Sequence, residues 1–164
     1  MKKVLTIAIF SLFLCMFICG ESYSIEEDTL KEALGGPEKI ERIEGKDYIF
    51  YSGKNKEDDF TGFAVILDEE GKHGIISFLV AIEPEGKIRK VEVLENSEVK
   101  GRPINQKRFL KQFVGKDSES PIELGKDIHA VTGATVSSAA AARAIKRALV
   151  IWEERRDVYG KKLQ

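Results

Sequence analysis

Four runs of β-branched and aromatic residues occupy the middle of this chain and constrain its fold more than any other feature. In chain order they read DYIFYSG, FTGFAVILD, HGIISFLVAIEP and KIRKVEVLE, separated by GKNKEDD, EEGK and EPEGK. Residues of this kind favour strands, and short polar connections with glycine favour hairpins. Proline and glycine in the segment 84–87 strengthen the last hairpin signal. We therefore expect a small antiparallel sheet, in which the imperfect alternation of the fourth run predicts a half-buried face.

Helical patterns flank these strands. Ser24 and Glu27 match a capping box before a short apolar side that stops at Gly35. After the strands, KRFLKQFVG has apolar residues at helical spacing and ends at Gly115, a predicted C-cap. A last helix places four apolar residues on one face: Ala141, Ile145, Ala148 and Trp152. This order predicts a single α+β domain, a small antiparallel sheet with helices packed on one side.

The first residues have the pattern of a secretory signal. Two lysines precede an apolar run from Val4 to Cys19, and small, polar and acidic residues follow it. The run is shorter than the ~20 apolar residues that span a bilayer comfortably. Three interpretations remain open: cleavage after Ser22 or Ser24, a retained membrane anchor, or a lipid on Cys19. All three place the body of the chain outside the cytoplasm.

These patterns divide the chain into four parts. We expect a signal peptide or membrane anchor at 1–22, a short helical linker at 23–39, the folded domain at 40–155 and a polar C-terminal tail at 156–164. A body of this length suits one domain with a hydrophobic core.

Composition excludes several functions for the body. Both cysteines, Cys15 and Cys19, lie in the first part, so the body has neither a disulfide nor a thiol nucleophile. The two histidines are too few to indicate a metal site. A net charge of -1 argues against nucleic acid as a partner. We predict no metal site and no catalytic side chain, so any redox chemistry must come from a bound cofactor.

A hydroxyl-rich turn, VTGATVSS, precedes the last helix. Gly133 permits a backbone conformation that a Cβ would oppose, and Ser137 or Ser138 is expected to N-cap the helix. Free N–H groups and the helix dipole favour an anion at this point, and the hydroxyls add donors. The turn is therefore either a phosphate site or simply a well-capped helix start.

The same stretch resembles the flavin-attachment motif of the FMN-binding domain family. That motif reads Ser/Thr-Gly-Ala-Thr-x-Ser/Thr-Ser before a helix, and here it is TGATVSS, residues 132–138. Members include the G subunit of Rnf electron-transport complexes and the C subunit of sodium-translocating NADH:quinone reductase. The strand pattern upstream follows the family's order over roughly a hundred residues, which makes the resemblance more specific than a short motif alone.

The resemblance implies FMN as a covalent cofactor, with its phosphate esterified to the hydroxyl of Thr135 by a flavin transferase that uses FAD and releases AMP. It also implies cofactor-binding roles for eight further residues: Thr132, Gly133, Ala134, Ser137, Ser138, His129, Gly74 and Glu98. Two positions depart from the family's pattern. His129 stands where many members have Asp, with Asp127 two residues earlier, and NSEVKGRPI replaces a His-x-Glu-Thr-Pro-Gly-like segment near the flavin ring.

Taken together, these features predict an extracytoplasmic electron-transfer flavoprotein, a redox carrier or subunit rather than a stand-alone enzyme. Its expected partners are the flavin transferase and membrane or extracytoplasmic redox proteins. One alternative is a secreted or membrane-anchored binding or scaffold module of the same fold with loosely bound or no flavin. Another is a flavin-dependent reductase with its own small substrate.

Overall fold

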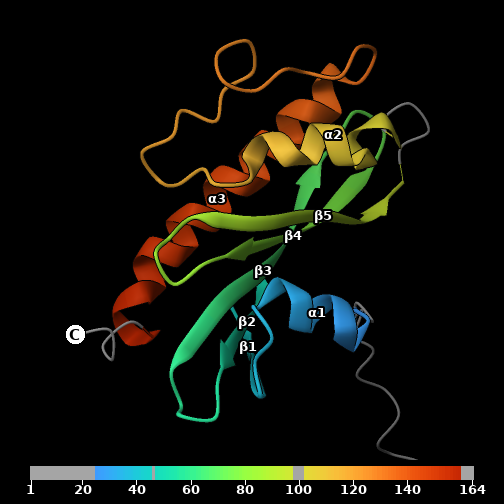
Figure 1. The fold of residues 1–164 in the computed structure, drawn as a ribbon. Helices are drawn as coiled ribbons and strands as arrows, with labels where there is room; N and C mark the ends of the chain where they lie inside the picture. Colours follow the sequence, from blue (N-terminus) through green and yellow to red (C-terminus); the bar gives the residue numbers. More distant parts are fainter. Residues whose placement is uncertain (1–24, 46, 98–101, 160–164) are drawn as a thin grey trace, which may run out of the picture.

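A five-stranded antiparallel sheet forms the centre of the structure, a computed structural model that describes residues 25–45, 47–97 and 102–159. Its strands are β1 (Lys39–Glu44), β2 (Ile49–Lys54), β3 (Phe60–Glu70), β4 (Ile75–Ile82) and β5 (Ile88–Asn96). They lie side by side in chain order, each antiparallel to the next (Figure 1). The predicted antiparallel sheet is confirmed, and β2 to β5 coincide with the four predicted runs.

Strand β1 is the element that the sequence patterns did not predict. Its sequence, KIERIE, is rich in charge, and none of its residues is fully buried. It forms one edge of the sheet and pairs only with β2. Charged side chains are common on edge strands because they discourage pairing with other molecules. The charged residues that suit an edge strand also interrupt the apolar pattern by which a strand is recognised in the sequence.

The imperfect alternation of β5 has a structural cause. Ile88 pairs with Ile82, but Ala81 pairs with Lys90, so the register shifts and Arg89 is the extra residue of a β-bulge. A bulge turns one more side chain to the same face and breaks the period of two. Val91 is buried, whereas the residues on either side are only partly so. The expected half-buried face is confirmed.

Helices cover the sheet unequally. The helical segments are α1 (Glu27–Ala33), η1 (Arg102–Asn105), α2 (Lys107–Leu110), η2 (Lys111–Phe113) and α3 (Thr135–Tyr159). Segments α2, η2 and α3 share one large hydrophobic core with one face of the sheet, and α1 packs with a smaller cluster on the other (Figure 1). The predicted α+β class, with its principal helices on one side, is confirmed, and α1 adds a short cover to the opposite face.

The larger core joins α3 to the strands. The predicted apolar face of α3 is fully buried: Ala141, Ile145 and Ala148 are 0% exposed and Trp152 is 2% exposed. The Trp152 ring stacks on Phe60 at 5.5 Å between ring centroids and tilts against Phe63 at 5.6 Å. Small alanine side chains let the helix backbone approach the sheet closely, and the Trp152 ring packs against the aromatic residues of β3.

The ends of the helices differ from the sequence-based expectations. Glu26 precedes α1 and makes no side-chain cap hydrogen bond, and Ser24 lies outside the described residues. The segment predicted as one helix up to Gly115 is an α-turn that tightens into the 3₁₀ helix η2. Helix α3 continues to Tyr159, so four residues of the predicted polar tail are helical.

Candidate functional site

The hydroxyl-rich turn ends where α3 begins, at Thr135. Gly133 has φ of +78°, a conformation that L side chains rarely adopt, and Ala134 donates its N–H to the carbonyl of Val131 at 2.9 Å. The prediction that Ser137 or Ser138 caps the helix is wrong, because both lie within its first turn. The chain turns at Gly133, before the serines, and Thr135 is therefore the first residue of the helix.

Ser138 instead holds the turn through hydrogen bonds to its main chain. Its hydroxyl accepts the N–H of Val131 at 3.1 Å and donates to the carbonyl of Ala134 at 2.8 Å. The side chain is 0% exposed. Since this hydroxyl already serves two main-chain groups, Ser138 supports the turn rather than offering a donor to a ligand. Ser137 is also buried, as is Ala134.

Replacing Ser138 with alanine should therefore destabilise the domain by about 1–3 kcal/mol, because both hydrogen bonds of the hydroxyl are lost and the N–H of Val131 is left without this partner. Urea denaturation of both proteins measures the difference. Ser118→Ala is the matched control, since the Ser118 hydroxyl is exposed and bonds Glu153 on the surface. A loss for Ser138→Ala no larger than that for the control would contradict the bracing role.

The two threonines of the turn are accessible. Thr132 and Thr135 are both exposed, next to the exposed Gly133. The first turn of α3 contains no acidic residue, and its N–H groups point beyond the helix end. The helix dipole adds partial positive charge there. Two exposed threonines, main-chain donors and a favourable field thus lie at this end of the helix, which suits a phosphate group.

His129 is exposed, and its main chain is held by Gln112 of η2. The Gln112 side chain accepts the N–H of His129 at 2.8 Å and donates to its carbonyl at 3.2 Å. Sequence reasoning missed Gln112, because a single glutamine on an amphipathic segment has no distinguishing pattern. Only the folded arrangement brings η2 against the loop.

Asp127 is committed to the loop that precedes the turn. One carboxylate oxygen accepts the N–H of Glu123 at 2.8 Å, and the other accepts the N–H of Ile122 at 3.1 Å and pairs with Lys116 at 2.7 Å. The hydrogen bond from Lys116, followed by the bond from Glu123, lowers the Asp127 pKa to about 2. This carboxylate therefore orders the loop that precedes the turn.

The lowered pKa predicts how stability depends on pH. Because the Asp127 pKa falls from 3.8 to about 2 on folding, its contribution is fully present above the unfolded pKa and is lost as the pH falls through the folded one. The Tm advantage of the parent over Asp127→Asn should stay constant above about pH 5 and shrink between about pH 4 and pH 2. Calorimetry across this range measures it. An advantage that stays constant down to pH 2 would contradict the assignment.

Gly74 lies in the β3–β4 hairpin, where the N–H of Gly71 bonds its carbonyl at 2.9 Å. Arg143 of α3 donates to the carbonyl of Glu70 at 2.8 Å and pairs with Glu69 at 3.1 Å, so the hairpin lies beside the N-terminal half of α3. A Cβ on Gly74 would come within 3.1 Å of the Cβ of Ser97, which gives this glycine a packing role of its own. Glu98 lies outside the described residues.

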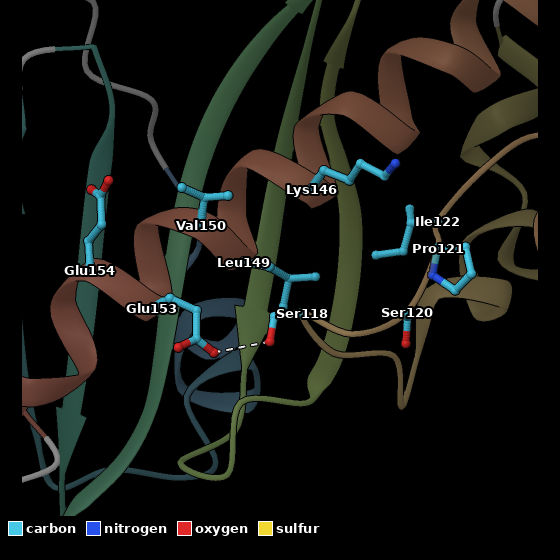
Figure 2. A pocket seen from close by; sticks show the side chains of 9 residues that line it. All are labelled: Ser118, Ser120, Pro121, Ile122, Lys146, Leu149, Val150, Glu153 and Glu154. Carbon is cyan, nitrogen blue, oxygen red and sulfur yellow. Dashed lines mark hydrogen bonds between the residues drawn. The ribbon is translucent and has the colours of Figure 1, made fainter.

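Two surface hollows lie elsewhere. One, of about 520 Å³, is formed by the loop 118–122 and the outer side of α3 from Lys146 to Glu154 (Figure 2). Another, of about 690 Å³, lies between β5 and α2. Neither of these two hollows includes a predicted site residue. Within the described residues, no helix is both long and apolar enough to cross a membrane.

Comparisons with known proteins agree with the motif. Residues 71–150 match the family model described as the FMN-binding domain. The G subunit of the proton-translocating ferredoxin:NAD(+) oxidoreductase complex of Clostridium ljungdahlii is 26% identical over 132 residues, which cover 76% of this chain and 70% of that protein. The crystal structure of Shewanella oneidensis NqrC aligns with 71% of this chain at 18% identity and a TM-score of 0.49, and the alignment covers 65% of the NqrC chain. The matched segment runs from the β3–β4 hairpin into α3 and contains Thr135, so over these residues the chain is similar to the FMN-binding domain.

Proposed function

We propose that this protein carries FMN covalently through a phosphoester on Thr135 and transfers electrons outside the cytoplasm. The observation that carries the proposal is the position of Thr135, an exposed hydroxyl at the N-terminus of a long helix, within the segment that matches the FMN-binding domain. The relative from Clostridium ljungdahlii, which belongs to a proton-translocating oxidoreductase complex, supports an electron-transfer role.

The local chemistry suits a phosphodiester. An ester to Thr135 leaves one negative charge on the phosphate, at the helix end where the dipole favours an anion and no acidic residue of the first turn opposes it. Thr132 offers a further exposed donor. Gly133 allows the main chain to turn close to the phosphate, and the buried Ala134 anchors the turn in the core. Ser137 is buried in the first turn of the helix, and Ser138 holds the turn in place.

The attachment step balances with FAD as donor. The Thr135 oxygen forms a bond to the phosphorus of the FMN half, the bond from that phosphorus to the bridging oxygen breaks, and AMP leaves. The threonine proton passes to a base on the flavin transferase, the partner that maturation requires. The chain itself supplies an accessible acceptor hydroxyl and no catalytic group.

Once attached, FMN supplies reversible electron transfer, and the protein holds and orients it. His129, Gly74 and Glu98 are proposed to border the flavin, since all three belong to segments that the motif or the family's order places near it. The donors and acceptors are membrane or extracytoplasmic redox proteins. In this proposal residues 1–22 direct the chain out of the cytoplasm or anchor it in the membrane. Residues 23–39 link this segment to the FMN-binding domain, which residues 40–155 form.

Co-production with a flavin transferase in an exporting host tests the function. We expect a yellow protein whose flavin stays with the polypeptide after acid precipitation, becomes reduced by dithionite under anaerobic conditions and is then reoxidised by a one-electron acceptor dye. Flavin released into the acid supernatant would favour the loosely bound alternative. A colourless protein would favour the scaffold module.

A separate fusion tests the location. Residues 1–24 joined to an alkaline phosphatase that is active only after export should give active enzyme, and a variant with Lys2 and Lys3 replaced and charges placed within the apolar run should not. Equal inactivity of both fusions would contradict the extracytoplasmic assignment.

A further inference from the structure

Gln112 holds the main chain of His129 at two points. Its amide oxygen accepts the N–H at 2.8 Å and its amide nitrogen donates to the carbonyl at 3.2 Å. A glutamine side chain thus pairs with one residue as a neighbouring strand would. Two bonds to one residue fix the orientation of both flanking peptide planes as well as their position.

A planar, neutral amide suits this pair of bonds. It presents one acceptor and one donor on the same planar group, whereas a carboxylate has acceptors alone and an aliphatic side chain has neither. Glutamate keeps the shape and the bond to the N–H but loses the donor to the carbonyl. Leucine has a similar bulk and loses both bonds.

The segment that provides Gln112 is itself anchored. Phe113, the next residue, is 0% exposed, and Phe109 is 3% exposed and meets it edge to face at 5.4 Å between ring centroids. The N–H of Gly115 and the carbonyl of Lys116 both bond Ile88, which ties the end of this segment to β5. Gln112 therefore extends from a fixed part of the core to an exposed loop, and Figure 1 shows α2 and its continuation lying across the sheet beside α3.

The two bonds from Gln112 affect the position of Thr135 through a short segment that is fixed at both ends. His129 lies six residues before Thr135, and the buried Ile128 precedes it. At the far end Ser138 holds Val131 and Ala134. Between these supports the chain is exposed at Ala130, Thr132 and Gly133.

We propose that Gln112 is a positioning residue for flavin attachment: its two bonds to His129 hold the turn so that the Thr135 hydroxyl meets the phosphorus of the incoming flavin nucleotide. This inference rests on the proposed function. It assigns no contact between Gln112 and the flavin. A shift of about 1 Å at a reacting atom can cost on the order of 100-fold in rate, so a remote clamp can control attachment.

The test follows attachment to the full chain under single-turnover conditions, with the FAD-loaded flavin transferase in excess and intact mass as the readout. The variants are Gln112→Leu and Gln112→Glu, with Lys111→Ala as the matched control, because Lys111 is an exposed neighbour on the same turn. We expect a rate about tenfold lower for Gln112→Leu, an intermediate rate for Gln112→Glu and an unchanged rate for Lys111→Ala.

Two further readouts separate positioning from a general structural role. Hydrogen exchange should increase in the peptide around 126–135 of Gln112→Leu and stay unchanged in β3 and β4, with Tm close to that of the parent. The rate defect should also persist at saturating transferase, because a misplaced hydroxyl lowers the rate of the chemical step and not only the encounter.

Equal attachment rates for the parent and Gln112→Leu would overturn the inference, and so would a defect that disappears at saturating transferase. Exchange that rises throughout the domain of both Gln112 variants would overturn it as well, because the loss would then reflect unfolding. Failure of the proposed function looks different: the parent chain itself would gain no flavin mass.

Discussion

Thr135→Ala abolishes the flavin mass in the expected result, while the parent gains one FMN less one water. The reason is chemical: no other oxygen of the turn combines exposure with a position at the helix N-terminus. Ser138 is 0% exposed and Ser137 is 3% exposed, and Thr132 precedes the helix across Gly133. Intact-mass spectrometry after co-production with a flavin transferase measures the gain.

Two variants show that the hydroxyl itself decides the result. Thr135→Ser keeps an oxygen at the same place and should retain attachment, and Thr132→Ala should retain it at reduced yield because it removes only a supporting donor. Full flavin mass on Thr135→Ala would contradict the assigned site. A flavin found on Thr132 by peptide mapping would move the site to the other side of the glycine.

Phe63→Ala should have the largest effect on stability, a loss of about 3–5 kcal/mol in the free energy of unfolding. The Phe63 side chain is 0% exposed and contacts Phe50 at 5.1 Å and Trp152 at 5.6 Å between ring centroids. Its removal leaves a cavity between β3 and the end of α3 that large rings cannot refill. Urea unfolding followed by tryptophan fluorescence measures the loss, because Trp152 is the single tryptophan of the chain.

Val150→Ala is the matched control for this substitution. Val150 lies on the same helix as Trp152 but is 56% exposed, so its truncation should change the free energy of unfolding by no more than about 0.5 kcal/mol. Phe63→Leu should fall between the two. A loss below about 1 kcal/mol for Phe63→Ala would show that the aromatic contacts contribute little.

The apolar strands and the long helix could be predicted because their signals are local. In β3, Phe63, Val65 and Leu67 face the larger core while Ala64 and Ile66 face the smaller one, so every residue from 62 to 67 is buried and the apolar run is easy to recognise. The apolar face of α3 repeats at helical spacing for the same reason. Strand β1 was not predicted, because its pairing with β2, rather than its own apolar content, makes it a strand.

The candidate turn divides in the same way. That TGATVSS precedes a helix and resembles a flavin-attachment motif is evident from residues in order, and so is the left-handed backbone that Gly133 supplies. The residue at which the helix begins is not evident from the sequence. It depends on Ser138, whose hydroxyl accepts the N–H of Val131 seven residues earlier once both are packed against the core.

The sequence by itself thus determined the class of the fold and the antiparallel strands with their buried faces, and it supplied the motif on which the proposal of flavin attachment at Thr135 rests. Only the tertiary structure decided that Asp127 orders a loop, that Ser138 serves the turn rather than a ligand, and that Gln112 reaches His129. The physical reason is the range of the interactions. Periodicity and turn chemistry act over a few neighbouring residues, whereas a hydrogen bond between η2 and a loop 17 residues away depends on how the whole core packs.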